Sequence, residues 1–252
     1  MRRETLYWST GMSGKLIGVG VGPGDPELLT VKGLRAMREA DEVFVPVGDT
    51  GEIGRAEAVV REHLGEDAAR VRRLLFALSN DTEARTRNWT NAAQEVAETL
   101  RRDANCAFAT IGDPNLYSTF TYLARAVREI IPEVEVDTVP GITAMQELAS
   151  RSGTVLLVGD EQLVLLPFTA GKSELRSALD GFETVVCYKG GGRLDEVLEV
   201  ARETGRLEDG TYGSWLGMNG GEIVQLPEMS GREGTYLSTV MFTRDDEGGR
   251  GI

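Results

Sequence analysis

The sequence predicts an α/β protein made of two αβα sub-domains, each with a largely parallel sheet covered by helices. Apolar runs of strand length alternate with helix-period segments along most of the chain. Several of these runs end in glycine- and proline-containing turns, and 252 residues suffice for one large or two small α/β domains. We place an N-terminal domain at residues 12–116 and a C-terminal domain at 117–252, and we expect the active site in the cleft between them.

The first half of the chain predicts four strands and four helices. Strands are expected at residues 16–20, 41–46, 71–76 and 106–111, and helices at 28–40, 55–64, 89–102 and 119–128. Thr30 and the run that begins at Asp25 are helix start signals, and Ser118 is expected to cap the fourth helix. Pro46 is expected to stop the second strand.

The second half continues the alternation and then becomes richer in strands. Strands are expected at residues 134–139, 163–167, 185–188, 211–216, 222–226 and 236–242, and helices at 142–150, 173–179 and 194–203. Strands that alternate with helices pair mostly in parallel, so this pattern supports the predicted fold class.

Few residues are available for thiol, imidazole or metal chemistry. Cys106 and Cys187 each lie in an apolar strand-like run, which favours buried structural thiols over a disulfide framework or a redox pair. His63 is the only histidine and lies in a charged helix, where we expect a solvated residue. With so few ligands we predict no metal site.

The charge balance argues against a nucleic-acid partner, because the formal net charge is −13. Arginine greatly outnumbers lysine, which suits either a GC-rich genome or a salt-adapted host.

No apolar run approaches the roughly 20 residues that span a bilayer, and the N-terminus lacks a signal-like apolar segment. We therefore expect a cytoplasmic protein with no membrane partner.

The glycine-rich loop at residues 18–26 follows the first strand but does not match a dinucleotide fingerprint. Pro23 and Asp25 stand where the third glycine of that pattern would be needed. The segment from Gly171 to Ser173 fails as a phosphate-binding loop, because Leu166 occupies the leading glycine position. The loop glycines therefore either let the backbone approach a bulky ligand or simply form a turn before the first helix.

Residues 112–118 form the most informative segment. A strand runs directly into the turn at Gly112, Asp113 and Pro114, and a helix follows. Open α/β sheets bind small ligands at such strand ends, so the pattern indicates a site without identifying its ligand. Asp113 is expected either to contact the ligand or to cap the next helix, and Tyr117 and Ser118 either face the ligand or begin that helix.

Three segments resemble the successive motifs of the tetrapyrrole methylases, which are S-adenosylmethionine-dependent enzymes with the class III methyltransferase fold. They are GVGVGPGDPELLT at residues 18–30, IGDP at 111–114 and VPGITA at 139–144. The resemblance covers residues 14 to about 243. Residues 117–123, 159–167 and 236–241 are similar to the branch that methylates C20 of precorrin-2 or cobalt-factor II.

The resemblance implies methyl transfer from S-adenosyl-L-methionine to C20 of the tetrapyrrole in cobalamin (corrin ring) biosynthesis. The methyl donor is already activated, so the protein supplies position and electrostatics rather than a nucleophile. By position in the family, the cofactor-binding residues are Pro23, Gly112, Asp113, Leu116, Thr143, Ala144, Tyr188 and Lys189. The substrate-side residues are Gly22, Asp25, Tyr117 and Ser118, and Tyr117 is also the candidate for a catalytic base.

The resemblance also implies a homodimer. The arginines that either receive the substrate carboxylates or form a solvated face are Arg70, Arg72, Arg73, Arg85 and Arg87.

Alternative functions are a sibling tetrapyrrole methylase that acts at another ring position, the branches acting on uroporphyrinogen III, diphthine or ribosomal RNA, and a non-catalytic S-adenosylmethionine-binding relative. An oxidoreductase is disfavoured by the failed fingerprint. Whether the substrate already carries cobalt stays open at this point.

Overall fold

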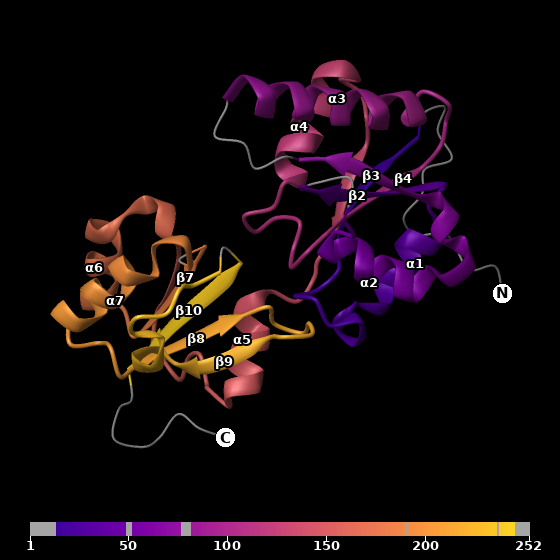
Figure 1. The fold of residues 1–252 in the computed structure, drawn as a ribbon. Helices are drawn as coiled ribbons and strands as arrows, with labels where there is room; N and C mark the ends of the chain where they lie inside the picture. The colour runs from indigo at the N-terminus through magenta and orange to yellow at the C-terminus, as the bar shows by residue number, and fades with distance from the viewer. Residues whose placement is uncertain (1–13, 49–51, 77–81, 190, 236, 245–252) are drawn as a thin grey trace. The chain divides into compact units, whose positions relative to one another are not determined.

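The protein divides into two compact units, Met1–Thr143 and Ala144–Ile252, each with its own five-stranded sheet (Figure 1). The computed structural model describes residues 14–48, 52–76, 82–189, 191–235 and 237–244. This described part does not include residues 12 and 13 of the predicted N-terminal domain or Tyr236 of the last predicted strand.

The division after Thr143 differs from the boundary expected between residues 116 and 117. Helix α4 (Phe120–Ile130) packs against the first sheet, and strand β5 (Val136–Val139) pairs with β1 (Leu16–Gly20). Both elements therefore belong to the first unit. Strand pairing over such a sequence separation is set by the tertiary fold and leaves no local sequence signal.

The first sheet is entirely parallel, with the strand order β3-β2-β4-β1-β5. Its other strands are β2 (Glu42–Val47), β3 (Val71–Leu75) and β4 (Cys106–Thr110). Strands β1 and β4 are buried along their whole length, as a near-continuous apolar run predicts for the centre of a parallel sheet.

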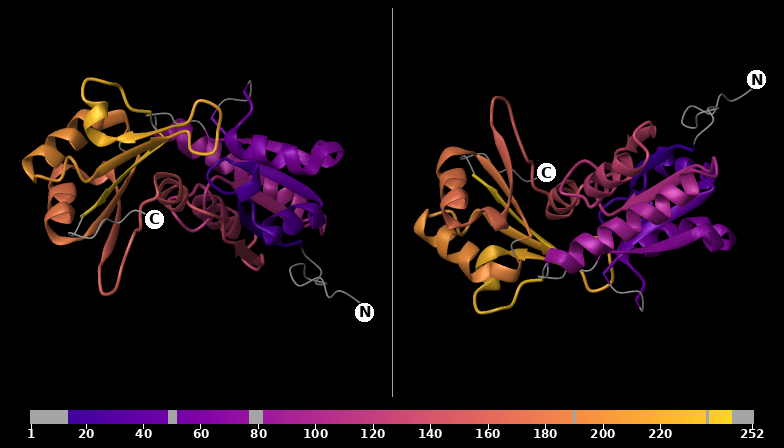
Figure 2. Two further views of the ribbon diagram at one scale, coloured as in Figure 1. Left: turned by 90° about the horizontal axis from the view of Figure 1, so that it is seen from below. Right: turned by 90° about the horizontal axis from the view of Figure 1, so that it is seen from above.

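Helices cover both faces of the first sheet. The helices α1 (Val31–Glu39) and α2 (Arg55–Leu64) share a buried cluster with Val43 and Val45. On the opposite face, α3 (Thr82–Leu100) and α4 pack on Phe44 and Phe108. Figure 1 shows these two helix layers on either side of the sheet, and Figure 2 shows them from below and above.

The predicted start signals are confirmed by the hydrogen bonds of the caps. Thr30 Oγ1 accepts from Gly33 N at 3.0 Å at the start of α1, and Asp25 Oδ1 accepts from Glu27 N at 2.9 Å at the start of the short helix η1 (Pro26–Leu28). The helix expected at residues 28–40 begins instead at Val31, and a separate short helix precedes it. Leu29 and Thr30 between the two helices are extended, which interrupts the helical hydrogen bonding.

The prediction that Pro46 stops the second strand is wrong, because β2 continues to Val47. Val47 O accepts from Phe76 N at 2.8 Å on the β3 side, so Pro46 directs its backbone to the other side. Pairing with β4 has already ended there at Phe44. The missing N–H of the proline therefore removes no bond from the ladder.

The second sheet has the order β6-β7-β10-β8-β9 and is mixed. Strand β6 (Leu163–Pro167) pairs in parallel with β7 (Thr184–Tyr188), whereas β10 (Ser238–Thr243) is antiparallel to both β7 and β8 (Gly210–Ser214). Strand β9 (Glu222–Gln225) is antiparallel to β8. The strand-rich last third, expected from the sequence, supplies the antiparallel strands β8, β9 and β10. Strands β8 and β9 are consecutive and are joined without a helical crossover, as antiparallel pairing permits.

Helices also lie on both faces of the second sheet (Figure 1). Helix α6 (Lys172–Gly181) and helix α7 (Leu194–Glu203) bury an apolar cluster with Val185 and Phe242. Helix α5 (Ala144–Ser152) covers the opposite face through Leu148 and Met241. The predicted α/β fold class with two sheets is confirmed.

Among the described residues, no helix combines the length and the apolar character that crossing a bilayer requires. The described part of the chain also holds no cluster of three or more His, Cys, Asp or Glu side chains that could bind a metal ion.

Candidate functional site

The three motifs converge at one edge of the first sheet. Strands β4, β1 and β5 are adjacent and parallel, so their carboxyl ends share an edge. Gly20 ends β1, Gly112 follows β4, and Gly141 follows β5. Ligands of open α/β sheets bind at this kind of edge.

The three glycines pack so closely that a side chain would not fit at two of them. A Cβ on Gly20 would lie 2.5 Å from Gly112 O, and a Cβ on Gly141 would lie 2.1 Å from the same oxygen. Gly112 N also donates to Gly22 O at 2.7 Å, which ties the first loop to the second. The glycine motifs are therefore required by backbone-to-backbone contact.

Gly112 differs from the other two because the space beside it is open. Its φ is +69°, and a Cβ built on it would meet nothing within 4 Å. A ligand can therefore approach the backbone at this position.

Asp113 joins the second loop to the third. Its Oδ1 accepts from Asn115 N at 2.8 Å, and its Oδ2 accepts from Gly141 N at 3.0 Å. Asn115 adds a second link, because its Nδ2 donates to Thr138 Oγ1 of β5 at 3.2 Å. These bonds lie in the turn and between loops rather than at the start of the next helix, which begins at Phe120, so the expected helix cap at Asp113 is corrected to a turn contact and a bond between loops.

Tyr117 lies in a left-handed conformation between anchored neighbours. Its φ is +50°, which is strained for a residue with a side chain, and the residue is 43% exposed. Ser118 is buried; its Oγ donates to Thr110 Oγ1 at 3.1 Å and accepts from Phe120 N at 3.1 Å. Ser118 therefore binds the first amide of α4, one residue before the N-cap position Thr119. Leu116 on the other side of Tyr117 is half-buried.

The glycine-rich first loop is held against α2. Gly22 and Pro23 are buried, while Asp25 is half-buried and caps η1. His63 Nε2 lies 2.9 Å from Pro26 O and donates to it in the matching tautomer. The expectation that His63 is a solvated helix residue is corrected: it is half-buried, and no local pattern pointed to its partner 37 positions away.

The remaining predicted cofactor residues lie around the start of the second unit. Thr143 is the last residue of the first unit, and Ala144 begins α5. The Tyr188 hydroxyl accepts from Met145 N at 3.1 Å, so the end of β7 satisfies a donor in the first turn of α5. Lys189 follows with a φ of +60°.

The arginines considered for substrate carboxylates have partners within the first unit. Arg73 Nε donates to Glu57 at 2.8 Å, Arg72 Nη2 lies 3.2 Å from Glu95 Oε2, and Arg70 Nη1 donates to Ala40 O. These bonds favour a structural role for all three. The side chain of Arg85 lies outside the described residues.

Neither cysteine is suited to nucleophilic chemistry. Both are buried and free, and burial raises the pKa of the Cys106 and Cys187 thiols to about 12. The prediction of two buried structural thiols is confirmed. What the converging loops offer is open backbone, small side chains and one strained tyrosine.

A family model of the tetrapyrrole (corrin/porphyrin) methylases matches residues 15–229. The chain therefore belongs to this family. The family match spans both units, and the resemblance seen in the three motifs is confirmed.

Two curated relatives are similar over most of their length. The chain is 37% identical over 188 residues to a probable cobalt-precorrin-2 C(20)-methyltransferase of Methanocaldococcus jannaschii, which covers 75% of this chain and 77% of that protein. It is 33% identical over 236 residues to a precorrin-2 C(20)-methyltransferase of Sinorhizobium sp, covering 90% and 94%.

Two solved structures share the fold. A putative cobalamin synthesis related protein of Corynebacterium diphtheriae matches with a TM-score of 0.68 at 19% identity, covering 92% of this chain and 99% of that one. Uroporphyrin-III C-methyl transferase of Thermus thermophilus, complexed with S-adenosyl homocysteine, matches with a TM-score of 0.64 at 20% identity and covers 92% and 98%.

Proposed function

We propose that the protein transfers a methyl group from S-adenosyl-L-methionine to C20 of precorrin-2 or cobalt-factor II in corrin ring biosynthesis. The observation that carries this proposal is the convergence of all three family motifs at the carboxyl edge of β4, β1 and β5. Family membership and the two C20-methyltransferase relatives support the choice of reaction. One relative is named for a cobalt-loaded substrate and the other for a metal-free one, so both are substrates to test.

The residues at this edge fit the cofactor. The open space beside Gly112 and the small residues around it accept a bulky nucleoside, and the first loop adds a buried Pro23. We assign cofactor binding to Pro23, Gly112, Leu116, Thr143, Ala144, Tyr188 and Lys189. Asp113 belongs to the same motif by its position in the family, and its carboxylate accepts from two backbone amides. The expectation that these residues act in a cleft between two domains stays a prediction.

S-adenosyl-L-methionine supplies a methyl group that is already activated on a sulfonium. The protein's own residues bind and orient the reactants and exclude water, which lowers the barrier without a covalent intermediate. We assign the substrate side to Gly22, Asp25, Tyr117 and Ser118. Within this group Ser118 Oγ already has two partners, so its part is to hold the strained Tyr117 in place.

Tyr117 is the residue we assign to the proton that the methylated carbon must lose. A neutral phenol is too weak a base to keep a second proton, so the Tyr117 hydroxyl takes up the proton from carbon as it releases its own to water. The residue is partly exposed beside the converging loops, where water can accept that proton. Tyr117→Phe is expected to reduce kcat while leaving the affinity for S-adenosylhomocysteine unchanged. An unchanged kcat would show that the proton leaves to water.

The proposed function is tested by binding and by product analysis. Calorimetry should detect S-adenosylhomocysteine binding and no NAD binding. An anaerobic assay with isotopically labelled S-adenosylmethionine, run on the metal-free and the cobalt-loaded tetrapyrrole, should place the label at C20 by NMR. Label at another ring carbon would instead identify a sibling methylase, and NAD binding without S-adenosylhomocysteine binding would exclude both.

We also propose that the enzyme is a homodimer, on the basis of the family resemblance, and that it is located in the cytoplasm. Light scattering of the purified protein should give twice the mass of one chain, 27.4 kDa. A single-chain mass at micromolar concentration would contradict the dimer, and recovery of the protein in a membrane fraction would contradict the location.

A further inference from the structure

We infer that Asp113 is a positioning residue whose carboxylate fixes the backbone of Gly141, rather than a direct contact of the cofactor. The inference rests on the proposed function, since it concerns the same site. It changes the role of a residue that the motif alone assigns to ligand binding.

Both carboxylate oxygens of Asp113 already accept backbone donors. Asn115 N lies 2.8 Å from Oδ1 and Gly141 N lies 3.0 Å from Oδ2. Hydrogen bonds to an ionised acceptor are stronger than those between neutral groups. The bond to Gly141 therefore links two segments that are 28 positions apart in the sequence.

Gly141 needs such a bond because it sits in the tightest contact of the site. A Cβ on Gly141 would lie 2.1 Å from Gly112 O and 2.8 Å from Gly20 Cα. The segment from Pro140 to Thr143 is neither helix nor strand, so regular backbone pairing does not hold it there. The Asp113 carboxylate supplies the missing restraint.

The position of Gly141 determines where the next residues of the chain lie, and two of them are assigned to cofactor binding. Thr143 and Ala144 follow it directly, and Ala144 begins α5. Loss of the Asp113 bond leaves the half-buried Gly141 N–H without this acceptor and lets the loop after β5 move away from Gly112. A displacement of this kind weakens the binding of S-adenosylhomocysteine and of its analogues by a similar factor.

A comparison of ligands separates positioning from contact. Affinities of wild type and Asp113→Ala are measured for S-adenosylhomocysteine, for its 2′,3′-dideoxy analogue and for 5′-methylthioadenosine. These analogues lack, respectively, the ribose hydroxyls and the amino acid that a carboxylate would contact. We expect the variant to bind all three about tenfold or more weakly, by a similar factor for each. A loss confined to ligands that carry one of these groups would overturn the inference.

Hydrogen exchange in the absence of ligand gives a second measurement. Its result would not change in the variant if Asp113 acted only by contacting the ligand. In Asp113→Ala without ligand, the Gly141 amide should exchange faster than in wild type, while amides of β1 keep their protection. Unchanged protection at Gly141 would also overturn the inference. If the alanine variant does not fold, Asp113→Asn, which keeps one acceptor oxygen, is measured in its place.

Asp41 provides a matched control. Its Oδ2 accepts from Asn105 N at 2.7 Å across a separation of 64 positions, but at the amino edge of the same sheet. Asp41→Ala should leave all three affinities and the Gly141 exchange rate within about twofold of wild type, since a bond at the opposite edge does not act on this loop. Failure of the wild type to bind S-adenosylhomocysteine would refute the proposed function, while the exchange measurement would still decide the role of Asp113.

Discussion

Glu57 carries a carboxylate in the interior of the first unit, and two arginines hold it. The side chain is fully buried in α2, with Arg61 Nε at 2.7 Å and Arg73 Nε at 2.8 Å. Burial by itself raises the pKa of Glu57, but the bonds from Arg61, Arg73 and Gly54 N outweigh it, so the pKa lies below its usual value. The pair with Arg61 lies within α2, whereas the pair with Arg73 joins α2 to β3.

We predict that this carboxylate makes stability dependent on acid pH. Because the pKa of Glu57 is lower in the folded than in the unfolded protein, its contribution is complete above the unfolded value near ~4.3 and is lost as the pH falls through the folded value. Urea unfolding of Glu57→Gln should show a loss of about 2–4 kcal/mol at pH 7 and a smaller loss below pH ~4. The control Glu95→Gln, in a partly exposed pair with Arg72, should lose less than about 1 kcal/mol. An equal effect of the two variants would contradict the prediction.

The two cysteines give a second prediction at this scale. Because burial raises the pKa of both thiols to about 12, neither forms thiolate at neutral pH. A colorimetric thiol reagent at pH 8 should react with neither in the native protein and with both in urea. Reaction of one thiol within seconds in the native state would show that its strand is accessible.

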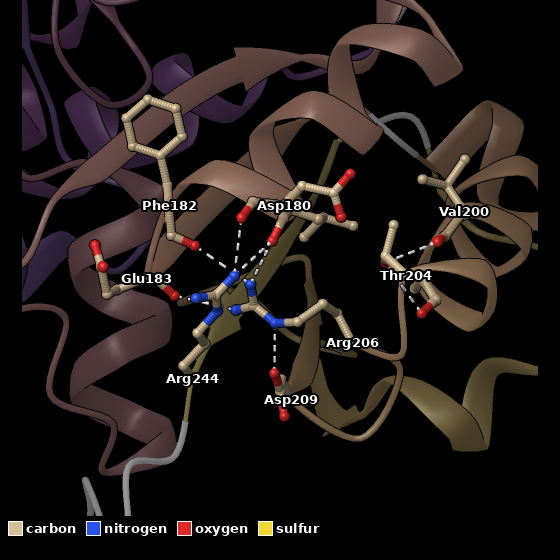
Figure 3. Close-up of polar contacts among 10 residues, drawn as sticks. Asp180, Phe182, Glu183, Val200, Thr204, Arg206, Asp209 and Arg244 are labelled. Atoms are coloured by element: carbon tan, nitrogen blue, oxygen red, sulfur yellow. Dashed lines mark hydrogen bonds and ion pairs between the residues drawn. The ribbon is translucent and has the colours of Figure 1, made fainter.

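At the scale of elements, the end of α6 is held by two arginines from distant segments (Figure 3). Arg206 is buried and donates to Leu179 O at 2.8 Å and to Glu183 O at 3.0 Å, while Arg244 Nη2 donates to Asp180 O at 3.0 Å. The last carbonyls of a helix lack partners within the helix, and positive charge is favourable there. The two guanidinium groups therefore terminate α6 in place of a local capping sequence.

We predict that Arg206→Ala destabilises the second unit by about 2–4 kcal/mol, since it leaves buried carbonyls unpaired. Arg206→Lys should recover little of this loss, because an ammonium group cannot reproduce the fork of the guanidinium. Arg176, on the same helix and paired with Glu203 at the surface, is the control, and its alanine variant should lose less than about 1 kcal/mol. Thermal unfolding followed by circular dichroism measures all three, and a full rescue by lysine would contradict the assigned geometry.

At the scale of the whole molecule, the formal net charge of −13 sets the response to salt. Like charges across one chain repel in the folded state, and the screening length falls from about 10 Å at 0.1 M to about 3 Å at 1 M salt. We predict that the Tm rises between 0.1 M and 1 M KCl. A falling Tm would mean that the surface ion pairs, such as Lys172–Glu199, contribute more than the overall repulsion.

The class of fold, most elements and the three motifs follow from local patterns in the sequence. The predicted bounds of α2, α7 and β6 coincide with the structure, because burial periodicity and caps are local properties of the chain. The motif glycines were found for the same reason. A turn with a positive φ or a close backbone contact restricts the residue type at its own position.

Contacts between residues that are distant in the sequence are visible only in the folded protein. The fold joined β5 to β1 and so moved the division of the chain to Thr143, and it turned His63 and Asp113 into links between segments. These partners depend on how strands order themselves in a sheet, and strand order is fixed by the packing of the whole core. A local pattern shows that Asp113 follows a strand, whereas its bond to Gly141 exists because β1 lies between β4 and β5.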